Sequence, residues 1–316
     1  FSVSSQKPEV QSFIDQGFGQ LHGFWYFESE RSFRQAAKLD PDCAIAFLGM
    51  ALSNLENMKR ARGFMAESVK RKDKASAREK LYIEAFDDFM KEEPKPDEEK
   101  ATDTKDTKPG SDEKSADKSS AEKKRREKLA SDLENILHEH PDDIEAKALL
   151  GWHLWVSRSK GLPITSYFAV DALLRDVLDK NPMHPCHHYI IHLWDKEKPE
   201  RALDSSAKCG QSAPAIAHMW HMPGHIYSGL HRYPDAVYQQ EASARVDYAH
   251  MMRTGVLPDQ IHNFAHNNEW LIRNLIHVGN ERAAREMALN MLELPRHPKW
   301  NKLEKSDCSS GFGRTR

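Results

Sequence analysis

The apolar residues of this chain recur at three- and four-residue intervals over most of its length, which is the period of an α-helix. No run alternates apolar and polar positions with the β-branched residues that are typical of a strand. Prolines stand at the points where helices would begin, because a missing backbone N–H costs least there. The pattern predicts an all-α chain.

The predicted helices pair into hairpins. Between Pro141 and Leu294 the pairs are 142–157 with 163–180, 185–195 with 199–209, 214–229 with 234–252, and 258–278 with 280–294. The N-terminal part predicts a pair of 9–24 with 27–39, followed by a helix at 44–52. The opening prolines lie 44, 29 and 44 residues apart, which brackets the roughly 34-residue period of tetratricopeptide repeats. We therefore expect a tetratricopeptide-like solenoid wound as a right-handed superhelix.

Residues 91–128 differ in composition from the rest of the chain. This segment holds 12 Lys/Arg and 12 Asp/Glu, and alanine is its only apolar side chain apart from proline. Such a segment cannot bury enough apolar surface to offset its ordering entropy. We interpret it as a charged low-complexity insertion that is disordered, or partly helical near Lys123–Leu129. The predicted segments are 1–90 and 129–316, both helical, with this insertion between them.

Charge and cysteine content exclude several classes of protein. A formal net charge of −2 gives no sign of a nucleic-acid partner. No apolar run approaches the roughly 20 residues that a membrane span needs. Cys43, Cys186, Cys209 and Cys308 form no CxxC pair, which argues against a zinc ribbon or a disulfide scaffold. These dispersed cysteines and a start at Phe1 rather than Met favour an exported, periplasmic protein.

Histidine is the enriched residue type: 17 in the chain, of which 12 lie between His184 and His277. Three successive first helices of the hairpins carry histidines three or four residues apart, and residues at that spacing share one helix face. They are His188 and His192 in 185–195, His218, His221 and His225 in 214–229, and His262 and His266 in 258–278.

These histidine stripes lie at nearly matching distances from the proline that opens each helix. The offsets are +3 and +7 after Pro185, +4, +7 and +11 after Pro214, and +4 and +8 after Pro258. In a solenoid the first helices of successive repeats stack side by side and line the concave surface. We therefore expect the imidazoles of three helices to converge on one patch.

Converging imidazoles indicate a metal ion. Protonated imidazoles would repel one another, and buried neutral ones would lose hydration, whereas a bound metal removes both costs. Imidazole donors without matched cysteines suit copper, iron or zinc. The spacing lacks the Glu of HExxH, which excludes a zincin-type protease. The predicted ligands are His188, His192, His221, His225, His262 and His266, with His187, His218 and His153 as further candidates.

Two alternatives stay open. Six ligands exceed one tetrahedral shell, so either two ions bind or some histidines act as acid–base groups. The protein is then a metalloenzyme, an oxidoreductase or a hydrolase, that acts on a small molecule or a peptide. The other reading is a non-enzymatic protein-interaction scaffold with a His-rich face. Carboxylates placed to orient the ligands are Asp195, Glu241, Asp247 and Glu269, and a kink at Pro223 is expected to aim His221 and His225 separately.

The segment His218-Met-Trp-His-Met-Pro-Gly-His-Ile-Tyr227 resembles a signature, His-Met-Pro-Ser-His-Ile-Tyr/Phe, of a group of bacterial tetratricopeptide-like proteins. His184-Pro-Cys-His-His-Tyr-Ile-Ile-His192 and Leu230-His-Arg-Tyr-Pro-Asp-Ala236 resemble its flanking segments. The resemblance implies the helical-hairpin fold and extends the histidine signature to His188, His192, His221 and His225. Gly224 stands where those proteins have Ser. The resemblance implies an envelope location but no particular reaction.

Overall fold

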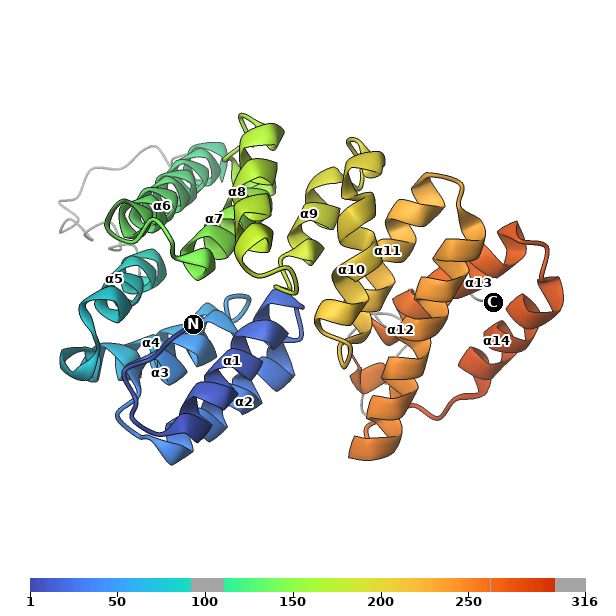
Figure 1. Ribbon diagram of the computed structural model, residues 1–316, viewed down its shortest axis with the longest axis horizontal. Helices are drawn as coiled ribbons and strands as arrows, with labels where there is room; N and C mark the ends of the chain where they lie inside the picture. Colours follow the sequence, from blue (N-terminus) through green and yellow to red (C-terminus); the bar gives the residue numbers. More distant parts are fainter. Residues whose placement is uncertain (92–110, 262, 299–316) are drawn as a thin grey trace, which may run out of the picture. The chain divides into compact units, whose positions relative to one another are not determined.

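The computed structural model describes residues 1–91, 111–261 and 263–298 (Figure 1). Every regular element within these ranges is a helix, which confirms the predicted all-α chain of helical hairpins. The predicted hairpins agree with the observed helices to within a few residues, except at 258–278. Cys308 and most of the first half of the charged segment lie outside the described residues.

The helices follow one another with short connections, and the elements η1–η4 are short 3₁₀ helices. Their bounds are α1 Pro8–His22, α2 Tyr26–Leu39, α3 Ala44–Leu52, α4 Met58–Lys70, η1 Lys72–Lys74, α5 Ala77–Met90, α6 Ser111–Glu139, α7 Ile144–Ser157, η2 Arg158–Lys160, α8 Tyr167–Lys180, α9 His187–Trp194, η3 Pro199–Ala202, α10 Leu203–Ser212, α11 Ala217–Gly229, α12 Tyr233–Thr254, η4 Pro258–Gln260, α13 Phe264–His277 and α14 Glu281–Glu293.

The chain divides into two compact units. The first unit contains Phe1–Phe18 and Tyr26–Asp176, and the second unit contains Gly19–Trp25 and the chain from Val177 onward. Along the sequence the chain therefore passes from one unit to the other inside α1, directly before α2 and inside α8. Helix α6 runs without a break through position 128, where the charged segment was predicted to end.

In the first unit, consecutive helices from α2 to α7 pack against one another. Small residues let the first three helices approach closely around Phe33, which is fully buried. A Cβ at Gly17 would lie 2.7 Å from the Phe33 ring, and a Cβ at Gly49 would lie 2.4 Å from it. Any larger residue at these two positions would force the helices apart, because protein interiors are close-packed.

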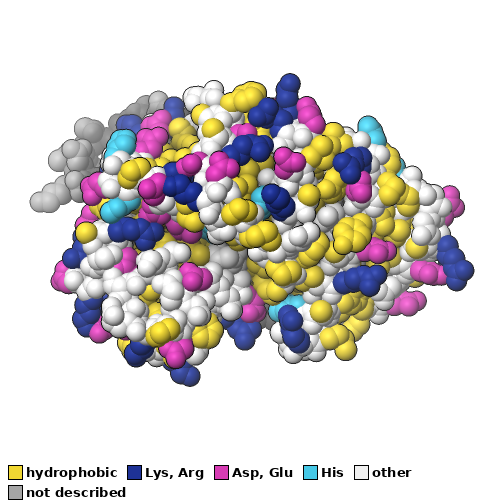
Figure 2. Space-filling model, in the orientation of Figure 1, with side chains coloured by type: hydrophobic (Ala, Val, Ile, Leu, Met, Phe, Trp, Pro, Cys, Tyr) yellow, Lys and Arg dark blue, Asp and Glu magenta, His cyan; other side chains and the backbone are white. Residues whose placement is uncertain are grey.

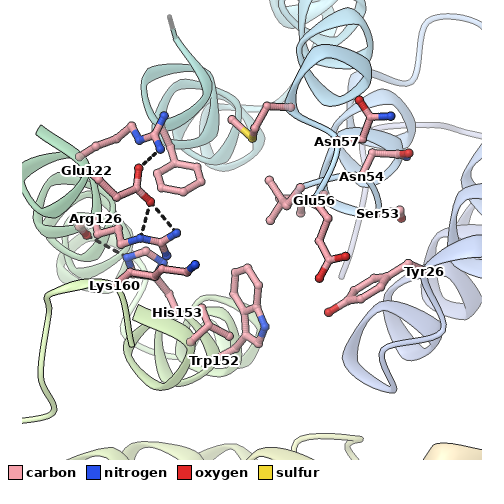
Figure 3. Close-up of a pocket in the computed structure, with 16 residues that line it drawn as sticks. Tyr26, Ser53, Asn54, Glu56, Asn57, Glu122, Arg126, Trp152, His153 and Lys160 are labelled. Carbon is pink, nitrogen blue, oxygen red and sulfur yellow. Dashed lines mark hydrogen bonds and ion pairs between the residues drawn. The ribbon is translucent and has the colours of Figure 1, made fainter. Parts of the chain in front are cut away.

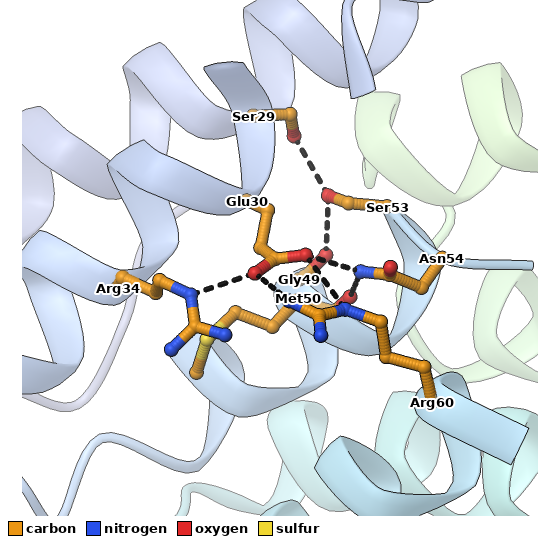
Figure 4. A network of polar contacts seen from close by, with 8 residues as sticks. All are labelled: Ser29, Glu30, Arg34, Gly49, Met50, Ser53, Asn54 and Arg60. Atoms are coloured by element: carbon orange, nitrogen blue, oxygen red, sulfur yellow. Dashed lines mark hydrogen bonds and ion pairs between the residues drawn. The ribbon is translucent and has the colours of Figure 1, made fainter. Parts of the chain in front are cut away.

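A polar network joins α2, α3 and α4 of the first unit (Figure 4). The Glu30 carboxylate accepts hydrogen bonds from Arg34 at 2.6 Å, Arg60 at 2.6 Å and Asn54 at 2.8 Å. Beside it, the Ser53 hydroxyl lies 3.0 Å from the Ser29 hydroxyl. Burial raises the pKa of Glu30, but the hydrogen bonds from Arg60, Asn54 and Arg34 outweigh it and the pKa is lowered. The network ties the end of α3 to its neighbours.

In the second unit, consecutive helices from α9 to α14 pack against one another, and α11 also contacts both α9 and α13 (Figure 1). The first helices of three successive hairpins therefore lie side by side, as the sequence predicts. This arrangement brings their histidine-bearing faces together.

The predicted helix 258–278 begins late. Pro258 opens the 3₁₀ helix η4, and α13 begins only at Phe264, six residues further on. Asn263 precedes it with φ 63°. This left-handed backbone, which asparagine tolerates better than most residues, interrupts the helical path.

Three features expected from the composition can be compared with the described residues: apolar helix length, charge distribution and cysteine pairing. None of the described helices combines the length and apolarity of a bilayer-spanning segment. On the face visible in Figure 2, basic and acidic side chains are interspersed rather than gathered by sign. Cys43, Cys186 and Cys209 are buried, and none of them forms a disulfide among the described residues.

Candidate metal centre

Six histidines of the second unit form two groups of three. The first histidine triad is His188 and His192 of α9 with His218 of α11. The second histidine triad is His221 and His225 of α11 with His266 of α13. Within each triad one ring nitrogen per histidine lies within 4.8 Å of the other two. Three imidazoles at this separation need only small movements to bind one ion.

The two triads share one geometry. In the first, the ring centroid of His188 lies 4.5 Å from that of His192 and 4.7 Å from that of His218. In the second, His221 lies 4.7 Å from His225 and 4.8 Å from His266. The two outer rings are 6.0 Å apart in both triads. Each triad thus has one fully buried central histidine and two half-buried ones.

The central histidine of the first triad is oriented by the backbone. His188 Nδ1 lies 2.8 Å from the carbonyl oxygen of His22, near the end of α1. A carbonyl oxygen only accepts, so Nδ1 carries the proton and Nε2 carries a lone pair. Nε2 is buried and has no hydrogen-bond partner among the described residues. This is the tautomer that a metal-binding imidazole needs.

The central histidine of the second triad is oriented by a glutamine. His221 Nδ1 donates to Gln240 Oε1 of α12 at 2.7 Å, and Gln240 Nε2 donates to the His221 carbonyl oxygen at 3.2 Å. Both groups of the amide are therefore engaged. His221 Nε2, which carries the lone pair, lies 2.8 Å from His225 Nε2. Again Nδ1 is held from outside and Nε2 is aimed into the triad.

Gly224 makes room for this glutamine. A Cβ at position 224 would lie 2.2 Å from Gln240 Nε2 and 2.8 Å from its Cδ. Because Gln240 is fully buried and doubly hydrogen-bonded, it cannot swing away without losing its hold on His221. The glycine within α11 is therefore part of the support for the second triad.

Burial keeps these imidazoles neutral. Desolvation lowers the pKa of His188 to about 4 and that of His225 to about 3, the latter with help from His266. Desolvation also holds the pKa of His221 well below its usual value, and the neighbouring His225 and His266 add to this. Near pH 7 these three imidazoles are therefore neutral, and a neutral imidazole offers one nitrogen lone pair to a metal ion.

Each triad has its own aromatic neighbour, which contacts all three of its imidazole rings. Phe24 lies 4.4 Å from His188, 5.6 Å from His192 and 5.8 Å from His218, between ring centroids. Trp270 of α13 lies 4.1 Å from His225, and it also contacts His221 and His266 at 6.4 and 6.3 Å. These rings limit the access of water to the imidazoles, which strengthens electrostatic interactions at both sites.

Phe24 adopts a strained backbone. Its φ is 57°, in the left-handed region that a bulky L-residue rarely enters. Such residues persist where the surrounding structure holds them, and they cluster at functional sites. Here the unusual backbone places the Phe24 ring against the first triad, which links the strain to the candidate site.

The structure brings together five of the six predicted ligands and adds His218 to them. His262 lies outside the described residues. His187 lies in neither triad, because its ring nitrogens face the Ser205 hydroxyl at 3.2 Å and the Pro182 carbonyl oxygen at 2.9 Å. His153 belongs to the first unit, where its Nε2 donates to the Arg126 carbonyl oxygen at 2.8 Å.

Sequence reasoning missed the groups that orient the ligands. Among the carboxylates suggested for this role, Asp247 accepts from Asn267, and Glu241 and Glu269 pair with arginines of their own helices. The signal in the sequence for one of these orienting groups is Gln240, a polar residue inside α12. The expected separate aiming of His221 and His225 by Pro223 is wrong: α11 continues through the proline and the two rings converge.

Comparisons with known proteins add little to this picture. No protein-family model matches the chain, and no curated protein matches it. YrrB, a TPR protein with an unusual peptide-binding site, is 15% identical over 69% of this chain and 94% of its own, with a TM-score of 0.36. The assembly chaperone Acl4 is 14% identical over 97% and 95%, with a TM-score of 0.34. The TPR2AB domain of yeast Sti1 is 10% identical over 84% and 98%, with a TM-score of 0.31. Likeness at this level bears on neither the site nor its chemistry.

Proposed function

We propose that this protein binds two transition-metal ions, one in each histidine triad, and uses them in chemistry on a small molecule or a peptide. One observation carries the proposal. In both triads the central histidine donates Nδ1–H to a fixed acceptor and turns Nε2 toward the other two rings. Metal-binding histidines are oriented in this way by a second hydrogen bond, and two independent acceptors produce it here.

The donor set favours copper or zinc over iron. Each triad offers imidazoles alone, without a carboxylate or a thiolate. Non-haem iron sites that activate oxygen usually include a carboxylate ligand, whereas imidazole donors suit zinc and copper. Three ligands also leave a coordination position for water or a substrate, which is the arrangement of catalytic rather than structural zinc sites.

The two ions would lie near each other. The triads adjoin through His218 and His221, one turn apart on α11, whose ring centroids are 5.9 Å apart. An ion lies about 2 Å from the nitrogen of each ligand and so about 3 Å from the ring centroid, which puts the two ions within roughly 12 Å of each other. Two Cu²⁺ ions at that distance would broaden each other's electron paramagnetic resonance spectrum, and the first ion bound would weaken the second by charge repulsion.

The test is metal content. Protein purified without a histidine tag is reconstituted with Cu²⁺ or Zn²⁺, freed of excess metal and measured by elemental analysis. Two equivalents per chain are expected. In a sample loaded with less than one equivalent of Cu²⁺, where the two ions do not broaden each other's spectrum, nitrogen couplings would identify imidazole ligands. Less than about a tenth of an equivalent of either metal, at a site built for tight binding, would sink the proposal.

Variants separate the two sites. His192→Ala and His266→Ala each remove a half-buried member of one triad, so each should leave one equivalent, whereas His277→Ala should leave two. His277 is exposed and lies in neither triad, which makes it the matched control. His188→Ala and His221→Ala repeat the test at the buried positions. Circular dichroism verifies that each variant is folded.

A protein-interaction scaffold is the second candidate function. Arrays of helical hairpins offer extended binding surfaces, and α12 exposes Tyr238 and Met252, which are 66% and 83% accessible. Exposed apolar side chains of this size often mark a protein contact. A protein that takes up no metal, yet binds a partner with equal affinity in the presence and absence of a chelator, would favour this function over the first.

A further inference from the structure

The first unit contains a pocket that the proposed metal chemistry does not use. Its volume is about 560 Å³, within the range of small-molecule sites. The walls come from the start of α2, the α3–α4 connection, the end of α5, α6, α7 and η2. Figure 3 shows the side chains that line it.

One wall of the pocket is basic. Arg125 and Arg126 of α6 both pair with Glu122, and Lys160 of η2 lies on the same side (Figure 3). Three cations against one carboxylate leave this wall with an excess of positive charge. Arg126 also donates to the Ser157 hydroxyl at 3.1 Å, which fixes its position. The wall is therefore ordered before any ligand arrives.

The opposite wall carries a carboxylate. Glu56 extends into the pocket beside Tyr26 (Figure 3). The turn that presents it is anchored, because the Asn57 N–H donates to the Asn54 carbonyl oxygen at 2.8 Å and the Asn54 side chain donates to Glu30. Asn57 in turn caps α4 by accepting from the Arg60 N–H.

The acidic group of one wall and the lysine of the other do not form an ion pair with each other. Neither Glu56 nor Lys160 forms a hydrogen bond or an ion pair within the part of the chain that the structure describes. Figure 3 shows them on opposite sides of the pocket with the Trp152 indole between them. Phe89, Val156 and Leu52 add apolar surface. The pocket thus offers an anion site, a cation site and an aromatic surface between them.

We propose that this pocket binds a small zwitterion, a free amino acid or a peptide of two or three residues. The ligand carboxylate lies against the Arg125, Arg126 and Lys160 wall, its ammonium group lies against Glu56, and its apolar side chain packs on Trp152. Glu56 and Lys160 are both exposed and solvated in the free protein, so a ligand with both charges gains a charge-assisted hydrogen bond at each of them, whereas a ligand with one charge gains only one. This inference stands apart from the metal centre, which belongs to the second unit.

Calorimetric titration of the 316-residue chain with phenylalanine, Leu-Phe and Ala-Leu-Phe tests the proposal. At least one should bind, and blocking its amino end with acetyl or its carboxyl end with amide should each weaken binding about tenfold, the size of one charge-assisted hydrogen bond. The member that binds most tightly assigns the length of the ligand. No binding of any member at about 5 mM, or equal binding of free and blocked forms, overturns the proposal.

Variants locate the contacts. Lys160→Gln should weaken binding of the free ligand about tenfold and leave binding of the amidated form unchanged. Glu56→Gln should weaken binding of the free ligand about tenfold and leave binding of the acetylated form unchanged. Lys124→Gln and Glu134→Gln, exposed positions outside the pocket, are the matched controls. Trp152→Ala should weaken all forms. Equal losses for free and blocked ligands in the two charge variants would place the ligand elsewhere and refute the assignment.

Discussion

The two units use the same helical hairpins but satisfy their buried polar groups in different ways. In the first unit, Glu30 is matched by arginines and an amide, so the network is complete within the chain. In the second unit, imidazoles face imidazoles, and the lone pair of His188 Nε2 has no hydrogen-bond donor among the described residues.

This difference indicates which unit needs a further component. Opposite charges satisfy each other, whereas the imidazoles of the second unit do so only in part: His225 Nε2 lies 2.8 Å from His221 Nε2, but His188 Nε2 has no hydrogen-bond partner among the described residues. The second unit nevertheless orients its central rings with two buried acceptors, the His22 carbonyl oxygen and Gln240 Oε1, and it contains the strained backbone of Phe24. On the proposal above, a metal ion is the component that makes such an arrangement favourable.

The largest expected effect is metal-dependent stabilisation of the second unit alone. Adding Cu²⁺ or Zn²⁺ at a thousandfold excess over its dissociation constant should stabilise the native state by about 4 kcal/mol. Hydrogen exchange should slow in α9, α11 and α13 but not in α2 to α5. Equal protection of both units, or none, would contradict the contrast between them.

The second-largest expected effect is a difference in acid stability between the two units of the metal-free protein. The pKa of His188 falls from about 6.5 in the unfolded chain to about 4 in the native state, so its stabilising contribution is complete above pH 6.5 and is lost as pH falls toward 4. The loss is about 3 kcal/mol for this residue. Hydrogen bonds from Arg60, Asn54 and Arg34 hold the pKa of Glu30 below its usual value near 4.5, so its contribution to stability is kept at pH 5.

Hydrogen exchange followed from pH 7 to pH 4.5 measures this difference. The second unit, where burial lowers the pKa of His188, His221 and His225, should open at a higher pH than the first, where burial lowers the pKa of His153 to about 4. Bound metal should move the transition of the second unit to lower pH. Loss of both units at one midpoint would show that buried histidines do not set the acid stability of the second unit.

Gly224→Ala should weaken the second metal site by 10- to 100-fold, as is usual when a group that orients a ligand is lost. The new Cβ displaces Gln240 and releases His221 Nδ1. Gly229→Ala is the control on the same helix, because nothing lies within 4 Å of its added Cβ. Competitive titration with a chromogenic chelator measures both. A similar loss in the two variants would mean that α11 itself, rather than Gln240, is disturbed.

The smallest effect belongs to the first unit. Glu30→Gln removes the carboxylate shared by Arg34 and Arg60 and should destabilise the first unit by about 1 kcal/mol, as for a half-exposed ion-pair network. Metal content should stay at two equivalents. Denaturant unfolding and elemental analysis check these outcomes together, and a change in metal content would show that the units depend on each other.

Apolar periodicity and the opening prolines together predicted most helices, because the residues of one helix face recur every three or four positions along the sequence. It failed at Asn263, where a left-handed residue delays α13 in a segment that Pro258 appeared to open as a helix. A backbone conformation of this kind is a local choice that depends on what packs around it, and apolar spacing does not encode it.

The sequence by itself determined which helix faces carry imidazoles, because residues three or four apart lie on one face whatever surrounds the helix. Only the tertiary structure decided how those imidazoles divide into triads and which nitrogen of each points inward. His188 is oriented by a carbonyl 166 positions away in the chain, and His221 by a glutamine held in place through Gly224. Hydrogen bonds between distant segments exist only once the helices have packed, so no spacing rule could have supplied them.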